Sequence, residues 1–226
     1  MIFDILKQGH RFANYVAFKR NRLRLLGLMK RGLKVGRNVY IFQDVEIDLG
    51  YPYLIEIGDN CRIGKDVLIL AHDATTFREL GITRLAPVKI LEGSFIGQRS
   101  IILPGVTIGP RALVAAGSVV NRDVQEGRAV AGNPARPYTT FTEILGRVGN
   151  EASEDNIYDF RDIEKGTLSP EIIRENADKK GIAFVRTVPS HDPFYINTDM
   201  EKIRTNAEDA YKRFVAMSNK KGLRKD

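Results

Sequence analysis

The chain has 226 residues, a hydrophobic content of 43% and a single cysteine, Cys61. This length suits one core domain with an appendage, and the apolar content is too high for a disordered chain. A lone cysteine cannot form an internal disulfide, which suits a reducing, cytoplasmic compartment. No apolar run reaches the roughly 18 residues of a membrane-spanning helix, so none is expected.

The net charge of +7 is concentrated at one end of the chain. Residues 1–37 hold ten Lys or Arg against one acid, and the remaining residues are net acidic by two. We expect residues 1–32 to form a helical cap with its basic side chains in solvent and an apolar face made of Phe12, Val16, Leu23 and Leu26. The confined charge argues against a nucleic-acid-binding domain and leaves open peripheral contact with an anionic membrane.

Aliphatic residues recur every six positions in two blocks of the chain. The first block contains Val35, Ile41, Ile47, Ile57, Ile63 and Ile69, and the second contains Ile90, Ile96, Ile102, Ile108, Val114 and Val120. The fifth position of each hexad in the second block is small or β-branched: Ser94, Ser100, Val106, Ala112, Ser118 and Val124. A helix repeats its apolar face every 3.6 residues, so a period of six indicates short extended segments and turns, stacked around one axis. Each buried Ile or Val contributes roughly 1.5–3 kcal/mol, so these side chains form a continuous hydrophobic column.

The repeat is interrupted twice. Residues 48–56 break the period by a few positions and indicate a small bulge or loop. Between Thr75 and Pro87 the period is lost entirely. The simplest interpretation is a solvated loop, but long excursions from a rigid scaffold often carry binding groups.

Residues 141–226 differ in composition from the repeat and predict an α-rich appendage. Ser169 and Pro170 form an N-cap and first-turn pair, and Gly181 provides a C-terminal stop. Thr198 and Glu201 have the spacing of a capping box for a second helix. Residues 182–188 are predicted to form a strand between the two helices.

Among the histidines His10, His72 and His191, only His72 lies within the repeat. It is the fourth residue of its hexad, where no column residue is expected, and it stands directly before the long loop. Acyl transfer from a thioester needs a base that works near neutral pH, and imidazole is the natural choice. From the residues alone, a catalytic histidine and an uninvolved one both remain open.

The hexads resemble the hexapeptide-repeat family, which implies a left-handed parallel β-helix over residues 33–140, with three hexads in each coil. The stretch Ala71-His72-Asp73 and the runs 102–109, 116–123 and 131–136 are similar to the sugar acetyltransferases of that family. The resemblance implies transfer of an acetyl group from acetyl-CoA to a hydroxyl or amino group of a sugar or nucleotide-sugar, as in capsule and O-antigen synthesis. It also implies His72 as general base, and a homotrimer with coenzyme A bound between subunits.

The resemblance assigns further roles by motif position. It places six residues at the cofactor: Phe95, Gln98, Ala116, Asn121, Arg122 and Arg136. Phe95 matches an aromatic residue near the thioester, and Arg136 matches a basic residue that can bind the phosphates of the cofactor. Asp48, Thr83 and Arg84 are candidates for contact with the acceptor. Asp73 either orients the imidazole or bonds to backbone amides at the corner, and the alternation of side chains along a strand favours the corner.

Other functions remain in competition. Carbonic anhydrases share the repeat but need three histidine ligands, and this repeat contains one, so no metal site is expected. A non-catalytic scaffold would bind no coenzyme A and would tolerate substitution of His72. Serine or an antibiotic as acceptor is not excluded. We expect direct transfer in a ternary complex, because Cys61 occupies a buried corner position and no Ser–His pair is evident.

Overall fold

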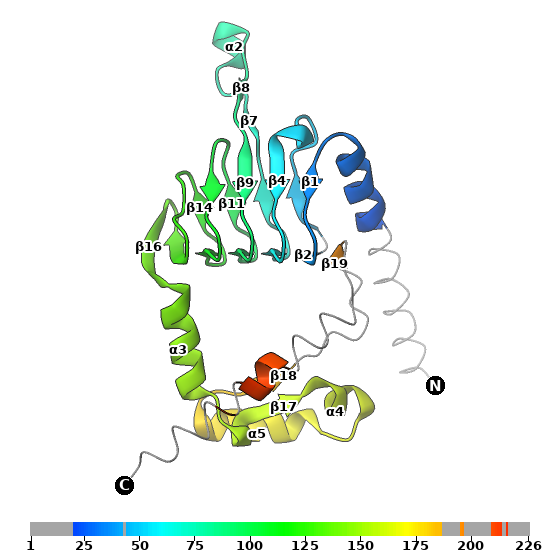
Figure 1. The fold of residues 1–226 in the computed structure, drawn as a ribbon, viewed down its shortest axis with the longest axis vertical. Coiled ribbons are helices and arrows are strands. Elements are labelled where there is room, and N and C mark those ends of the chain that lie inside the picture. Colours follow the sequence, from blue (N-terminus) through cyan, green and yellow to red (C-terminus); the bar gives the residue numbers. More distant parts are fainter. Residues whose placement is uncertain (1–19, 43, 187–194, 197–208, 214–215, 217–226) are drawn as a thin grey trace. The chain divides into compact units, whose positions relative to one another are not determined.

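The computed structural model describes residues 20–42, 44–186, 195–196, 209–213 and 216 (Figure 1). The chain forms two compact units. The first contains Met1–Phe141 with Pro193–Thr198, and the second contains Thr142–Asp192 with Asp199–Asp226.

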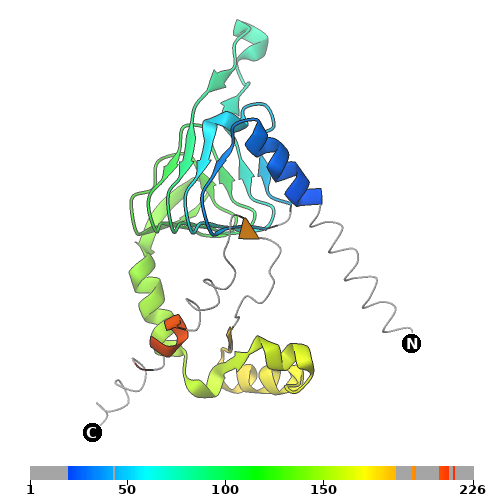
Figure 2. The same cartoon turned by 45° about the vertical axis from the view of Figure 1, so that its right-hand side comes forward.

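The first unit is a parallel β-helix with three sheets (Figure 2). The first sheet contains β1 (Lys34–Val35), β4 (Ile55–Ile57), β9 (Val88–Ile90) and β12 (Thr107–Ile108). The second sheet contains β2 (Val39–Ile41), β5 (Arg62–Ile63), β10 (Phe95–Ile96), β13 (Leu113–Val114) and β15 (Arg128–Gly132), with β16 (Ala135–Thr140) and β19 (Tyr195–Ile196) antiparallel at its two ends. The third sheet contains β3 (Glu46–Ile47), β6 (Leu68–Ile69), β11 (Ile101–Ile102) and β14 (Val119–Val120). From β1 to β14, apart from the two strands within residues 72–85, consecutive strands fall in successive sheets, so each set of three strands completes one coil.

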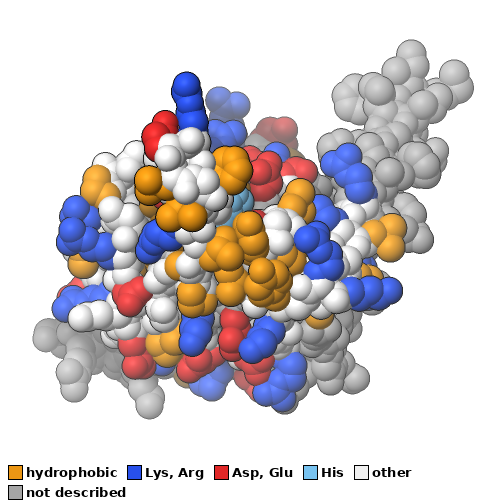
Figure 3. All heavy atoms as spheres, turned by 90° about the horizontal axis from the view of Figure 1, so that it is seen from above, with side chains coloured by type: hydrophobic (Ala, Val, Ile, Leu, Met, Phe, Trp, Pro, Cys, Tyr) orange, Lys and Arg blue, Asp and Glu red, His pale blue; other side chains and the backbone are white. Residues whose placement is uncertain are grey.

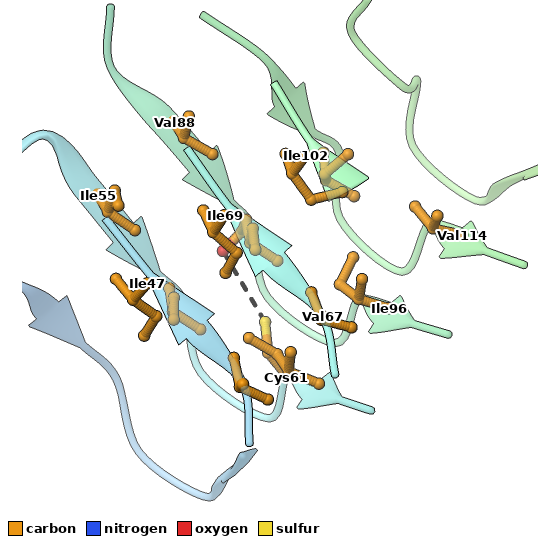
Figure 4. Close-up of a cluster of buried hydrophobic side chains, with 14 of the residues drawn as sticks. Ile47, Ile55, Cys61, Val67, Ile69, Val88, Ile96, Ile102 and Val114 are labelled. Carbon is orange, nitrogen blue, oxygen red and sulfur yellow. Dashed lines mark hydrogen bonds between the residues drawn. The ribbon is translucent and has the colours of Figure 1, made fainter. Parts of the chain in front are cut away.

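The predicted aliphatic column is confirmed as the core of the coils. Strand pairing places Ile63, Ile96 and Val114 in register, each with no exposed side-chain area. Ile96 and Val114 are among the buried side chains labelled in Figure 4. All the column residues are buried except Val35, which is partly buried in the first coil. The fifth-position residues are buried as well, and their hydroxyls are satisfied: Ser94 Oγ donates to the Gly109 carbonyl at 2.8 Å. The stacked hexads therefore account for the hydrophobic core.

Glycine follows several column residues because the next coil leaves no room for a side chain. A Cβ atom on Gly97 would lie 2.4 Å from the Ala116 amide nitrogen. On Gly109 it would lie 2.6 Å from the Glu126 amide nitrogen. At these corners the backbone of the next coil therefore occupies the space that a side chain would need.

A helix over residues 20–30 covers the N-terminal end of the coils (Figure 1). Its core-facing residues are Leu25 and Leu28, each 3% exposed. The predicted apolar face was wrong, because Leu23 and Leu26 are 70% and 45% exposed. Leucines occur on several sides of this helix, so periodicity alone does not identify the buried side. Phe12 and Val16 lie outside the described residues.

Both interruptions leave the coils at the corner between the third and first sheets. The first contains the short 3-10 helix η1 (Pro52–Leu54). The second is an antiparallel hairpin of β7 (His72–Asp73) and β8 (Arg84–Leu85), with α2 (Phe77–Leu80) at its tip. The segment predicted as a loop is therefore an ordered projection, visible at the top of Figure 1.

The second unit begins at Thr142, the second residue of α3 (Phe141–Glu151). It also contains η2 (Glu154–Asn156), β17 (Ile157–Asp159), α4 (Phe160–Lys165), α5 (Pro170–Lys180) and β18 (Phe184–Arg186). Helix α5 begins as the sequence predicts, because Ser169 Oγ accepts a hydrogen bond from the Glu171 amide at 3.2 Å. It ends at Gly181, whose φ is 75°. The capping pair Thr198 and Glu201 lies outside the described residues. In the part of the chain that the structure describes, no helix is both long and apolar enough to cross a membrane.

Truncating one column residue tests the stacked core. Ile63→Ala is expected to lower the free energy of unfolding by about 2–5 kcal/mol, because it removes buried methyl groups and leaves a cavity. Arg62→Ala is the control, since Arg62 is exposed on the same strand, and its effect is expected within about 0.5 kcal/mol. Urea unfolding measures both variants, and equal losses would contradict a buried column.

Candidate active site

Stacking of the coils brings His72 onto Asp48. Ile47 of β3 and Ile69 of β6 are in register, so the residue after each strand lies at the same corner. The Asp48 amide donates to the Ile69 carbonyl at 2.9 Å, and the Asp48 carboxylate contacts His72 Nδ1. Two residues that are far apart in sequence thus form a pair at the base of the hairpin.

Asp48 is held as a buried carboxylate. Its side chain has no exposed area, and it accepts hydrogen bonds from the amides of Ala71 and Gly50, both at 2.9 Å, and of Tyr51 at 3.2 Å. Burial acts to raise the pKa of Asp48, but the hydrogen bonds from His72, Ala71 and Tyr51 outweigh it and bring the pKa below the ordinary 3.8. Asp48 is therefore ionised at neutral pH.

The ionised carboxylate determines which imidazole nitrogen is available. A carboxylate only accepts hydrogen bonds, so the proton of neutral His72 is assigned to Nδ1 and Nε2 keeps its lone pair. The His72 side chain is 34% exposed, whereas that of Asp48 is fully covered. This arrangement is suited to a base whose inner nitrogen is anchored and whose outer nitrogen can accept a proton.

Tyr51 from the first interruption lies next to this pair, and Tyr53 packs against Tyr51. The ring centroids of Tyr51 and His72 are 5.2 Å apart at an interplanar angle of 56°. Tyr53 lies edge-on to Tyr51 at 6.2 Å and is 55% exposed. Figure 3 looks down on the hairpin and shows apolar side chains beside it, with a histidine among them. Sequence reasoning missed both tyrosines, although aromatic residues flanking Pro52 at an interruption were a usable signal.

Asp73 has a different role from Asp48. Its carboxylate accepts hydrogen bonds from the Thr75 amide at 2.9 Å and from the Thr75 hydroxyl. The hydroxyl and then the amide of Thr75 hold the pKa of Asp73 below its ordinary value. Of the two placements considered for Asp73, the structure shows the backbone-bonded one, and Asp48 takes the place beside the imidazole.

The residues predicted to contact the acceptor differ in how exposed they are. Thr83 is partly buried, and Arg84 is exposed on β8 in register with Asp73. Arg84 is therefore accessible to an acceptor. Asp48 is not, because its carboxylate is covered, and its assignment as a direct acceptor contact is corrected to support of His72.

The predicted cofactor residues lie on two different corners of the coils. Phe95 is 42% exposed on β10 of the second sheet, and exposed Gln98 and Ala116 follow β10 and β13 at the next corner. Asn121 and Arg122 follow β14, at the corner from which the hairpin rises two coils earlier. Phe95, Gln98 and Ala116 are therefore one sheet away from His72, and a single chain does not gather the predicted residues into one site.

A cavity of about 340 Å³ lies beyond β14 and is rich in arginine. Arg122, Arg128 and Arg136 line it together with Gln125 and Asp123. The one acid among them is engaged, since Asp123 Oδ1 accepts a hydrogen bond from the Thr107 amide at 2.7 Å. Three guanidinium groups around one cavity fit an anionic nucleotide, because guanidinium binds phosphate oxygens in pairs. Sequence reasoning identified Arg122 and Arg136 but missed Arg128 and Gln125.

Cys61 provides no nucleophile. It has no exposed area, and its Sγ lies 3.0 Å from the Leu91 carbonyl oxygen. Burial raises the pKa of the Cys61 thiol to about 11, so the thiolate is scarce at neutral pH. Among the described residues, no cluster of three His, Cys, Asp or Glu could hold a metal ion.

Known proteins share the repeat. The profile of the family "Bacterial transferase hexapeptide (six repeats)" matches residues 87–122. The chain is 37% identical over 120 residues to YvoF of Bacillus subtilis (strain 168), which is named as an acetyltransferase, covering 53% of this chain and 67% of YvoF. It is 32% identical over 107 residues to the galactoside O-acetyltransferase of Escherichia coli (strain K12), covering 46% of this chain and 52% of that enzyme.

A solved maltose O-acetyltransferase from Clostridium difficile 630 is 29% identical to this chain, with a TM-score of 0.43. The match covers 50% of this chain and 72% of that protein. The chain therefore belongs to the hexapeptide-repeat acetyltransferases, enzymes that take their acetyl group from acetyl-CoA.

The buried carboxylate predicts a particular pH dependence of stability. Because folding lowers the pKa of Asp48, its contribution is complete above the ordinary pKa of 3.8 and is lost as pH falls through the lower folded value. Asp48→Asn is expected to lower the free energy of unfolding by roughly 1–3 kcal/mol at pH 7. The reason is that the amide nitrogen of Asn replaces one carboxylate oxygen and cannot accept the hydrogen bonds which that oxygen accepted. The gap to wild type is expected to narrow below about pH 4.

Urea unfolding between pH 7 and pH 3 measures this gap. Asp66→Asn is the matched control, because Asp66 pairs with Arg99 at 3.6 Å on the surface and such pairs contribute little. A gap for Asp48→Asn that stays constant down to pH 3 would contradict the buried carboxylate.

Proposed function

We propose that this enzyme transfers the acetyl group of acetyl-CoA to a hydroxyl or amino group of a sugar or nucleotide-sugar, with His72 as general base. The observation that carries the proposal is the pairing of His72 Nδ1 with the buried carboxylate of Asp48. This pair anchors Nδ1 of a side chain that is 34% exposed, and Nε2 takes no part in it. Family membership supplies the reaction class, and the pair supplies the base that the reaction needs.

His72 moves one proton in the proposed reaction. Nε2 accepts the proton of the attacking hydroxyl or amine while its oxygen or nitrogen forms a bond to the thioester carbonyl carbon. The carbon–sulfur bond then breaks, and His72 returns the proton to the departing thiolate. Asp48 stabilises the imidazolium between these steps through its hydrogen bond to Nδ1. No acyl-enzyme forms, which agrees with the protonated, buried thiol of Cys61.

The coils are proposed to wind left-handed and to assemble as a homotrimer, with each active site between two copies. Support comes from the distribution of the predicted residues, because Phe95, Gln98 and Ala116 lie one sheet away from His72 in the same chain. A neighbouring copy can bring its second sheet to the hairpin corner of the first. The arginine-lined cavity is proposed to hold the phosphates of the donor, with Arg122 and Arg136 as its predicted contacts. Asn121, which precedes Arg122 in the chain, is proposed as a further contact of the donor.

The sugar-type acceptor is supported by the side chains around His72. Tyr51 presents aromatic surface next to the imidazole, exposed Tyr53 packs against Tyr51, and Arg84 is exposed on the hairpin. An aromatic ring packs against the apolar face of a pyranose, while its hydroxyls need polar partners, so a mixed lining suits a sugar. The names of the galactoside and maltose O-acetyltransferases point in the same direction. The free, buried thiol agrees with a cytoplasmic location.

Removal of the base tests the assignment directly. His72→Ala is expected to lower turnover by roughly 10²–10⁴-fold, while coenzyme A still binds, because the imidazole acts on the acceptor proton. Thiol release from acetyl-CoA is followed with nucleotide amino sugars, galactosides, serine and chloramphenicol as acceptors, and calorimetry measures coenzyme A affinity. His191→Ala is the matched control. Unchanged turnover in His72→Ala would refute the base, and activity with serine or chloramphenicol alone would refute the sugar acceptor.

Mixing two inactive variants tests the shared site. His72→Ala removes the base, and Ala116→Trp blocks the second-sheet corner, where Ala116 is exposed. Randomly mixed trimers are expected to regain about a quarter of wild-type activity, because about one interface in four then joins two intact halves. Each variant alone and an unmixed blend of the two preparations are the controls. No recovery in trimers shown to be mixed by mass spectrometry would contradict a site shared between copies.

A further inference from the structure

The helix over residues 20–30 has a second apolar face that points away from the core. Leu25 and Leu28 are buried against the coils, whereas Leu23 and Leu26 are 70% and 45% exposed. At about 100° per residue, Leu23 and Leu26 lie nearly opposite the buried pair. Capping the coils therefore explains the inner face of the helix and leaves the outer leucines without a partner among the described residues.

Basic side chains surround these outer leucines. Arg20, Arg22, Lys30 and Arg31 are all exposed, and residues 20–37 contain no acid. Lys34 and Arg37 have acidic partners, at 3.8 Å in Glu56 and 2.7 Å in Asp59, but no ion pair between described residues involves the other four. Lys30 lies between the positions of Leu23 and Leu26 on the helical wheel, and Arg22 and Arg20 flank them, while Arg31 is the first residue of the turn that follows the helix.

We propose that this outer face, formed by Leu23, Leu26, Arg20, Arg22, Lys30 and Arg31, docks on an anionic lipid bilayer. Apolar side chains between cations match the interface of such a membrane, where leucine enters the acyl boundary and Lys or Arg meets lipid phosphate. A nucleic acid would use the cations and leave the leucines in water. A second copy of this chain would bring four more exposed cations against the first four.

The proposal is independent of acetyl transfer and uses binding alone as its readout. The full chain is incubated with vesicles of phosphatidylcholine, with or without about 30% phosphatidylglycerol, and bound protein is measured by flotation. Binding is expected only with phosphatidylglycerol, and it is expected to weaken steeply with salt because the Debye length shortens. Failure to float with the anionic vesicles at low salt would overturn the proposal.

Two variants separate the apolar and charged contributions. Leu23→Ser with Leu26→Ser is expected to weaken binding at least tenfold, since two apolar side chains no longer enter the bilayer. Arg22→Gln with Lys30→Gln is expected to weaken it about thirtyfold, because each removed cation contributes about 1 kcal/mol, or roughly fivefold. Lys165→Gln with Lys179→Gln in α4 and α5 is the matched control, which removes the same charge elsewhere and is expected to bind within about twofold of wild type.

Alternative partners give opposite results. A leucine variant that changes the oligomeric mass in light scattering while floating like wild type would assign the face to a second copy and overturn the proposal. Equal loss of vesicle binding in the α4 and α5 control would show attraction by net charge alone and would also overturn it. Binding to duplex DNA that requires Arg22 and Lys30 but not the leucines, without flotation, would assign the face to nucleic acid instead.

Discussion

The register between successive coils is the constraint on which the rest of the structure depends. Each column residue lies directly above its counterpart in the neighbouring coil, as Ile47 lies on Ile69 and Ile96 on Val114. Parallel pairing at a spacing of about 4.8 Å leaves little freedom for the residues at the corners. A slip of one position would turn the aliphatic side chains outward, so burial of the column holds every corner residue in place.

The active-site pair follows from that register. Asp48 and Leu70 are the residues that follow the stacked strands β3 and β6, and His72 lies two positions further on. The Ala71 amide donates to Asp48, which couples the path of the hairpin to the carboxylate. A buried carboxylate without these donors would be costly, so the backbone that carries His72 also satisfies the group that orients it. The ordered backbone of the coils therefore also fixes the position of the imidazole.

The His72–Asp48 pair and the arginine-lined cavity both lie at the corner between the third and first sheets of the first unit. Both excursions leave the coils there, and the arginine-lined cavity begins at the same corner two coils further along. The other corners are closed by tight turns in which glycine is needed, as at Gly97. Insertions are therefore tolerated at one corner, which is open to solvent, and functional groups accumulate where the fold permits loops. The outer face of the N-terminal helix is a separate surface of the same unit.

The sequence by itself determined the coil architecture, because a period of six is incompatible with a helix and because every sixth residue is aliphatic. It also singled out His72, as the one histidine in the repeat beside a long interruption, and it predicted the cap of α5 from Ser169. Only the tertiary structure decided the partner of the imidazole. Asp73 is adjacent in the chain, but neighbouring residues of a strand point in opposite directions, whereas stacking brings Asp48 to Nδ1 from another coil. The structure likewise decided which leucines of the N-terminal helix are buried, since that depends on the surface against which the helix packs and not on its own periodicity.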